Sequence, residues 1–219
     1  MLEEEKIGFL KRELIEHATL VEAMIDKSIK GLVNKEREML LEVMEKDEPK
    51  TNDFEIKLDE LGTVIIAQHQ PKGKSLRTVL MILKINNDLE RMGDHAANIA
   101  ESVLSLIEVP AIKTIDDILR MAEVTRSMLK DSIDSFIRED IRLAQEVCER
   151  DNIVDELRNC IRKEIVGAMC LDVSAVETSL NVMRIARNLE RIADLSTNVS
   201  EDVIFMVEGK VIKHKMDKI

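Results

Sequence analysis

Residues 86–103, with the sequence NNDLERMGDHAANIAESV, decide the fold of this chain, because the chain contains a second version of them. The second version begins 100 residues later, at residues 186–203, and its sequence is ARNLERIADLSTNVSEDV. Seven of the eighteen aligned positions are identical, whereas about one match is expected from ordinary residue usage. An internal repeat of this kind predicts two versions of one structural unit.

Each version carries a row of oxygen-bearing side chains on one side of a predicted helix. Because each residue turns a helix by about 100°, the four positions fall within a sector of about 80°. Apolar residues such as Leu89 and Ile99 lie on the opposite side and must face a core, so we expect this acidic stripe to face water or a surface groove. The stripe consists of Glu90, Asp94, Asn98 and Glu101 in the first version, and of Glu190, Asp194, Asn198 and Glu201 in the second.

Such a stripe destabilises its helix by roughly a few tenths of a kcal/mol per like-charged pair unless something positive neutralises it. Arg91 and Arg191, beside the stripes, are one source of positive charge. A hard cation is another, since carboxylate and amide oxygens suit Mg²⁺, Ca²⁺, Mn²⁺ and oxidised iron. A solvated face with scattered salt bridges is the simpler interpretation for a chain with 34% charged residues. The amide at both Asn98 and Asn198 favours the ligand hypothesis, because a solvated face does not need it.

A further acidic pair lies on the middle predicted helix of each half. It is Asp151 and Asp155 in the second half, and an offset of 103 residues maps this pair onto Glu48 and Asn52. Consecutive helices joined by a short turn are antiparallel neighbours in a bundle, so each pair is expected to face the stripe of the third helix. That arrangement would supply about four to six oxygen ligands per half, which is plausible for a metal site built from two helices.

The composition of the 219 residues is typical of an all-helical protein, with 45% hydrophobic residues, 2% aromatic residues, 7 Gly and 3 Pro. The net charge of −11 and the shortage of aromatic stacking groups argue against a nucleic-acid binder and against direct attraction to an anionic membrane. No apolar run reaches membrane-spanning length and the acidic N-terminus does not resemble a signal peptide, so we expect a cytoplasmic protein. Its three cysteines (Cys148, Cys160 and Cys170) are expected to be reduced thiols in the core.

Apolar residues recur at steps of three and four along most of the chain, which predicts six long helices. Pro49 should kink or interrupt the second of them, because proline has no N–H to donate within a helix. The first half is predicted to form helices from Ile7 to about Leu32, from Lys35 to His69 and from Ser75 to about Ile107. The second half repeats this plan, with the fifth helix ending near Cys170 and the sixth at Gly209.

Local signals mark the ends of these helices. Ser75 is predicted to cap the third helix, and Ser174 with Glu177 resembles a Ser-x-x-Glu capping box before the sixth. Val109-Pro110 marks the boundary between the halves, because proline restricts the residue before it. We therefore predict an all-α fold of two tandem, structurally similar three-helix bundles, at residues 1–108 and 109–219, that pack side by side.

The doubled motif resembles the PhoU family. Leu-Glu-Arg-x-x-Asp, followed by Asn and Glu, occurs at residues 89–101 and 189–201, and the segments QHQP at 68–71 and LRTVL at 76–80 also resemble the first repeat of that family. The resemblance spans residues 10–209. It implies two three-helix bundles with metal ions held at the bundle surface by Glu/Asp-x-x-x-Asp motifs. It also implies a negative regulator of phosphate uptake and phosphate-starvation signalling, not an enzyme.

The resemblance carries the metal-binding role to particular residues of this chain. The matching pairs are Glu90 with Asp94, Glu190 with Asp194, and Asp151 with Asp155. Glu48 and Asn52 match less well because Asn52 replaces an acid, so the first site is expected to be weaker or of different nuclearity. Together with the remaining stripe residues, the expected ligand set is Glu48, Asn52, Glu90, Asp94, Asn98, Glu101, Asp151, Asp155, Glu190, Asp194, Asn198 and Glu201.

The implied cofactors are divalent or trivalent metal ions, with multinuclear sites as one option. Iron is the first expectation, and manganese, magnesium or zinc are alternatives. The expected partners are a phosphate-specific ABC transporter and the phosphate-responsive sensor histidine kinase. The chain is expected to meet the membrane only through these partners, with a homodimer as one option for its own assembly.

Two other interpretations remain open. A carboxylate-bridged di-metal enzyme needs Glu-x-x-His on inward faces of a bundle. The histidines of this chain fail that test, because the residues three positions before them are Leu14, Ile66, Met92 and Val211. A metal-free helical adaptor or scaffold would have the same two-bundle fold as the metal-binding regulator. It would differ only in that its acidic stripes bind no metal.

Overall fold

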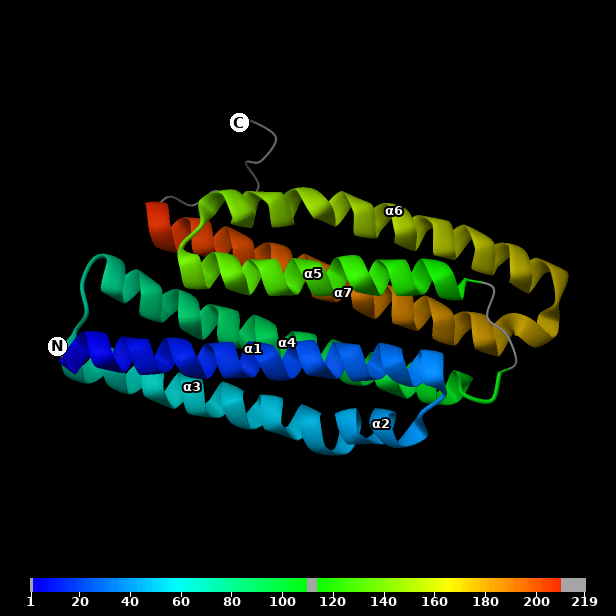
Figure 1. The fold of residues 1–219 in the computed structure, drawn as a ribbon, viewed down its shortest axis with the longest axis horizontal. Helices are drawn as coiled ribbons and strands as arrows, with labels where there is room; N and C mark the ends of the chain where they lie inside the picture. Colours follow the sequence, from blue (N-terminus) through cyan, green and yellow to red (C-terminus); the bar gives the residue numbers. More distant parts are fainter. Residues whose placement is uncertain (1, 110–113, 210–219) are drawn as a thin grey trace.

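The computed structural model describes residues 2–109 and 114–209, and within these ranges the protein is helical with no strand (Figure 1). This confirms the predicted all-α fold of six long helices. The first half contains α1 (Leu2–Asn34), α2 (Arg37–Glu42), the π-helix η1 (Val43–Asp47), α3 (Glu48–His69) and α4 (Lys74–Leu106). The second half contains α5 (Ile115–Arg138), α6 (Ile141–Leu171), the 3₁₀-helix η2 (Val173–Ala175) and α7 (Val176–Glu208).

The second long helix of the first half changes its winding just before Pro49, as predicted. Pro49 lies in the first turn of α3, where its missing N–H leaves no hydrogen bond to the preceding turn. The five residues before α3 form the π-helix η1, a wider turn that accommodates such an interruption and that occurs often near functional sites. Glu48 is therefore the first residue of α3.

Two predicted helix caps are wrong. The N-cap position of α4 is Gly73, with a positive φ of 57°, and no side chain caps this helix, so Ser75 does not have the predicted role. Before α7, the side chain of Asp172 accepts hydrogen bonds from the backbone N–H and the hydroxyl of Ser174, at 2.8 Å and 2.7 Å. Asp172 thus holds the short η2 turn, and the expected box of Ser174 with Glu177 does not form, because α7 begins later, at Val176.

The two halves pack side by side through the helices that carry the acidic stripes. In Figure 1 the first half lies below the second, and α4 of the first packs along α7 of the second, with a smaller contact between α1 and α5. Leu89 of α4 and Leu189 of α7, which are equivalent in the repeat, are both fully buried. Apolar sides of both stripe helices are therefore in the core, and their acidic sides remain available at the surface.

Polar contacts along α4 and α7 show that the two helices are antiparallel. Arg77 Nε, near the start of α4, donates to the backbone oxygen of Met206 near the end of α7, at 3.3 Å. Further along α4, His95 Nδ1 donates to Asn188 Oδ1 at 2.9 Å. The halves thus form one packed body across this interface. Pro110, at the predicted boundary, lies outside the described residues, and the division at residues 108 and 109 stays a prediction.

The cysteines correct a further expectation, because Cys160 and Cys170 are exposed and only Cys148 is partly buried. All three are free thiols. Among the described residues, no helix combines the length and the apolar character that crossing a membrane requires.

Candidate functional site

The first acidic cluster, which comprises Glu48, Asn52 and Glu55 of α3 and Glu90 and Asp94 of α4, lies between these two helices. Burial raises the pKa of Glu90 above its ordinary value, and the charge of Asp94 raises it further. Burial likewise raises the pKa of Asp94. The charges of Glu48 and Glu55 raise the pKa of both carboxyls, which places all four acids close together. Asn52 Nδ2 donates to Glu48 Oε1 at 2.9 Å.

A glycine brings α3 and α4 together at this cluster. Gly93 lies on α4 between Glu90 and Asp94, and a Cβ added there would lie 3.0 Å from the side chain of Thr51 on α3. Thr51 and Gly93 are both buried. The close approach of the two backbones places the carboxylates of α3 opposite those of α4, on the surface side of the contact.

Glu55 is not among the ligands predicted from the sequence. This residue is seven positions after Glu48, so it lies on the same side of α3, and its spacing was a usable signal. Its backbone also helps to position the cluster. Asn86, buried on α4, donates from Nδ2 to the backbone oxygen of Glu55 at 3.0 Å and accepts from Nδ1 of His17 at 3.0 Å.

The second acidic cluster comprises Asp151 and Asp155 of α6 with Glu190 and Asp194 of α7. Burial raises the pKa of Asp151 to about 6, and the charges of the other three carboxylates add to this increase. Two arginines partly neutralise the cluster. Arg158 Nε lies 3.0 Å from Glu190 Oε2, and Arg191 Nη1 donates to Asp194 Oδ2 at 3.2 Å.

The two clusters differ at one aligned position. The offset of 103 residues that relates Glu48 to Asp151 also relates Glu55 to Arg158. The first cluster therefore contains a fourth carboxylate that replaces the acid missing at Asn52, while the second contains a cation paired with Glu190. The first cluster thus has the larger net negative charge, and this predicts the tighter cation site there, whereas Asn52 alone predicts the weaker one.

The remaining stripe residues lie beyond the two clusters. Asn98 and Glu101 line a groove of about 560 Å³ between α4 and α7, together with His95 and Asn188. Glu201 lies near Cys148 of α6: burial raises the pKa of that thiol to about 12, and the charges of Glu201 and Asp151 contribute. Asn198 is partly buried. The stripe of each helix thus faces different neighbours along its length.

The chemistry of both clusters fits a hard cation. Their donors are carboxylate and amide oxygens. Burial first, and then the neighbouring carboxylates, raise the pKa of Glu90 and Asp151, and a bound cation would counteract the repulsion between these carboxylates. Among the described residues, however, no three His, Cys, Asp or Glu side chains converge on one point as a metal ion requires. Arg158, Arg191 and the Asn52 amide currently engage some of these carboxylates. Binding would replace these contacts.

Asp151→Asn is expected to stabilise the metal-free protein by about 1 kcal/mol at pH 7, and this gain should disappear near pH 4. Between its ordinary pKa of 3.8 and about 6, the folded protein keeps a proton on Asp151 that the unfolded chain has released, so stability falls as the pH rises through this range. The full shift corresponds to about 3 kcal/mol, and we reduce it to about 1 kcal/mol because solvent screens this partly exposed side chain.

Urea unfolding in chelator at pH 4, 5.5 and 7, which lie near the lower end of the range, within it and above it, measures this effect. Asp116→Asn, at an exposed acid outside both clusters, is the matched control. An equal pH dependence in the parent and in Asp151→Asn would contradict the prediction.

The fold and the two clusters define a class of all-α proteins in which two tandem three-helix bundles each carry an acidic surface cluster between two helices. A family model described as the PhoU domain matches the chain twice, at residues 14–103 and 118–203. The chain belongs to the PhoU family, which confirms the resemblance inferred from the doubled motif.

Similar proteins are known by sequence and by structure. The chain is 37% identical over 205 residues to the phosphate-specific transport system accessory protein PhoU homolog of Aquifex aeolicus, covering 94% of this chain and 92% of that protein. It is 31% identical over 215 residues to PhoU homolog 2 of Thermotoga maritima, covering 98% and 91%. The crystal structure of PhoU from Pseudomonas aeruginosa matches with a TM-score of 0.90 and 28% identity, covering 94% of this chain and 99% of that one. PhoU from Streptococcus pneumoniae, described as a phosphate transport system regulatory protein, has a TM-score of 0.88 and 26% identity, covering 95% and 98%.

Proposed function

We propose that this protein is a non-enzymatic, metal-binding regulator that represses phosphate uptake and phosphate-starvation signalling. Its partners are a phosphate-specific ABC transporter and the sensor histidine kinase that responds to phosphate, and it meets them at the cytoplasmic side of the membrane. The observation that carries the proposal is the pair of acidic clusters, one on the equivalent helix pair of each half. Relatives with these two repeats are described as accessory proteins of phosphate-specific transport systems.

Metal binding by the clusters follows from their donors. Glu48, Glu55, Glu90 and Asp94 would hold an ion in the first cluster, with the Asn52 amide as a further oxygen donor. Asp151, Asp155, Glu190 and Asp194 would hold one in the second. The chemistry that a bound ion supplies is a positive charge with coordination positions open to a further oxygen ligand.

The position of the clusters suggests how they act. Each lies on the side of its helix pair away from the core, and Glu90 and Asp194 are only partly buried. The carboxylates of both helices hold the positive charge at the surface, where a carboxylate or phosphate group of a partner can reach it. Association with a partner would then depend on metal, while the protein itself catalyses no reaction.

The test is co-purification of the chain with its transporter and kinase. The variant in which Glu90, Asp94, Glu190 and Asp194 are all replaced by alanine should keep its helix content and lose most of its partner, because only the carboxylates of α3 and α6 remain. Chelator should weaken the parent complex in the same way. The matched control replaces four exposed acids outside both clusters, namely Glu5, Glu38, Glu123 and Glu164.

Two outcomes would contradict this proposal, the first its metal-dependent docking and the second its regulatory role. Undiminished capture of transporter and kinase by the folded quadruple variant would eliminate metal-dependent docking and favour the adaptor. No capture by the parent, combined with unchanged expression of phosphate-starvation genes after deletion of the protein, would contradict the regulatory role itself.

A further inference from the structure

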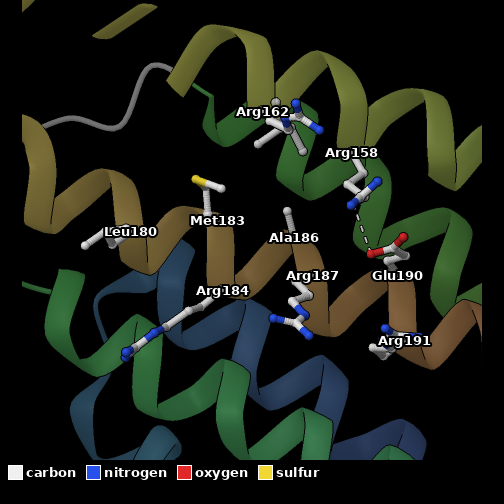
Figure 2. A pocket seen from close by; sticks show the side chains of 10 residues that line it. Arg158, Arg162, Leu180, Met183, Arg184, Ala186, Arg187, Glu190 and Arg191 are labelled. Carbon is white, nitrogen blue, oxygen red and sulfur yellow. Dashed lines mark ion pairs between the residues drawn. The ribbon is translucent and has the colours of Figure 1, made fainter. Parts of the chain in front are cut away.

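An arginine-lined groove of about 570 Å³ runs between α6 and α7 in the second half. Figure 2 shows Arg158 and Arg162 on α6, and Arg184, Arg187 and Arg191 on α7. Arg184, Arg187 and Arg191 also line the neighbouring groove between α4 and α7. The exposed side of α7 is thus a ridge of positive charge between two grooves, in a protein whose net charge is −11.

Among the described residues, three of these arginines form no ion pair with an acidic side chain. Arg158 and Arg191 pair with Glu190 and Asp194 of the second acidic cluster. In contrast, Arg162, Arg184 and Arg187 form no ion pair within residues 2–109 and 114–209, and all three are exposed. Within the described residues, three exposed guanidinium groups on the two sides of the groove thus remain available to an acidic partner from outside the chain.

The corresponding surface of the first half carries less positive charge, and its two cations are paired with acids. At the equivalent position of Arg162 the first half has Asp59, and at that of Arg187 it has Asn87. Lys84, the counterpart of Arg184, pairs with Asp202. The three arginines without an acidic partner are therefore specific to the second half, whereas both halves share the acidic clusters.

The packing beneath the groove also differs between the halves. In the first half, a Cβ added to Gly62 of α3 would lie 2.4 Å from Leu83 of α4, so the two helices approach closely there. The second half has Ile165 and Met183 at these positions. Ile165 is buried where the first half has this glycine, so the two helix pairs pack differently beneath the groove, which lies between α6 and α7.

An apolar row runs beside the arginines. Val176, Leu180 and Met183 follow one another at helical spacing on α7, and Leu180 remains 51% exposed. In Figure 2, Met183 points toward α6, while Arg184 and Arg187 point to the side where α4 passes. From Leu180 to Arg191 the row and the ridge extend for about 16 Å, the length of roughly three helical turns.

We propose that this surface binds an acidic amphipathic helix of a partner protein. Apolar side chains of that helix would cover Leu180 and Met183, and its glutamates or aspartates would meet Arg162, Arg184 and Arg187. The groove is longer than a single oxyanion and has an apolar floor, and the helix N–H groups along it are already used within α6 and α7. These features favour a helix over free phosphate.

Within the described residues, α1 is an acidic helix that is already packed. Its apolar side faces the core, since Leu10 and Leu14 are fully buried. The last ten residues of the sequence, KVIKHKMDKI, are basic. The charge of the arginines therefore calls for an acidic helix with an unpacked apolar side, and we take this helix to belong to a different protein.

The test uses the full chain and a synthetic peptide of about 16 residues, roughly 24 Å long as a helix, with leucine at positions i, i+3, i+4 and i+7 and glutamate elsewhere. Its control has the same composition in scrambled order. Calorimetry should detect binding of the helical peptide, at least about tenfold weaker binding of the scrambled one, and a similar loss in the variant Arg162→Glu, Arg184→Glu, Arg187→Glu. The matched variant, with the same charge change at exposed sites elsewhere, is Arg37→Glu, Arg120→Glu, Arg142→Glu.

The other occupants are outcomes that overturn the proposal. Equal binding of both peptides, or equal loss in both triple variants, would mean general electrostatic attraction. Tighter binding of inorganic phosphate or tripolyphosphate than of the helical peptide would identify an oxyanion site. Self-association in sedimentation experiments that the groove variant abolishes would identify a second copy. Circular dichroism establishes that both triple variants are folded, so failure of the peptide to bind the parent also overturns it.

Discussion

Replacing Glu90 and Asp94 together by alanine is expected to weaken binding of Mn²⁺ to the first acidic cluster by about a hundredfold or more. The variant keeps only the α3 side of the cluster, because Glu90 and Asp94 are its contribution from α4. In the parent, burial and the charge of Asp94 disfavour the ionised form of Glu90. The double substitution removes both carboxylates, so the metal-free variant should be no less stable than the parent.

Thermal unfolding in Mn²⁺ and in chelator measures this effect. An ion bound only by the folded state stabilises it by about 2.7 kcal/mol at a hundredfold excess over its Kd. The parent should therefore melt at a higher temperature in metal, and Glu90→Ala with Asp94→Ala should lose most of that increase. Glu5→Ala with Glu123→Ala, which replaces two exposed acids outside both clusters, is the matched control.

The difference between the clusters gives this experiment a second arm. Arg158→Glu introduces into the second cluster the residue that the first cluster has at Glu55, and should raise its affinity for the ion, because it removes the cation paired with Glu190. Glu55→Arg should have the opposite effect on the first cluster. Identical melting curves of the parent in metal and in chelator would contradict metal binding and leave the solvated-surface interpretation standing.

Acidification from pH 7 to pH 4 is expected to destabilise the protein by about 3 kcal/mol through His17. This histidine is fully buried, donates from Nδ1 to Asn86 Oδ1 at 3.0 Å and stacks on Phe54 with the ring centroids 5.2 Å apart. Burial lowers its pKa from 6.5 to about 4, against the smaller opposite effect of the Asn86 hydrogen bond.

The sign of the effect follows from proton binding. Between pH 6.5 and about pH 4 the unfolded chain protonates His17 while the folded protein keeps it neutral. The contribution of neutral His17 is therefore complete above pH 6.5 and is lost as the pH falls through that range. Asp151 acts in the opposite direction over part of the same range, so each must be measured against its own variant.

His17→Gln separates the two effects. Glutamine does not titrate and can still donate to Asn86, so the variant should be less stable than the parent at pH 7 but should lose less stability on acidification. Urea unfolding at both pH values measures the difference. Replacing the partly buried His69 by glutamine is the control and should leave the pH dependence nearly unchanged. Equal loss of stability in the parent and in His17→Gln would show that this histidine does not control acid sensitivity.

The sequence by itself determined the repeat, the helices and most of the candidate ligands. The matching stretches around Glu90 and Glu190, and apolar residues at steps of three and four, are enough to predict two equivalent helical units. The interruption at Pro49 was also predictable, because proline changes the backbone wherever it occurs in a helix. These properties are local or periodic, so they require no knowledge of which helices touch.

Only the tertiary structure decided which charges meet. Glu55 joins Glu90 because Gly93 lets α3 approach α4, and Arg158 meets Glu190 because α6 packs on α7. The caps at Gly73 and Asp172 depend on backbone conformation at the turns, which residue preferences alone did not specify. The arginine groove, too, combines residues of two helices across a gap. Electrostatic energy depends on the distance and the solvent between charges, and those are set by packing, not by spacing along the chain.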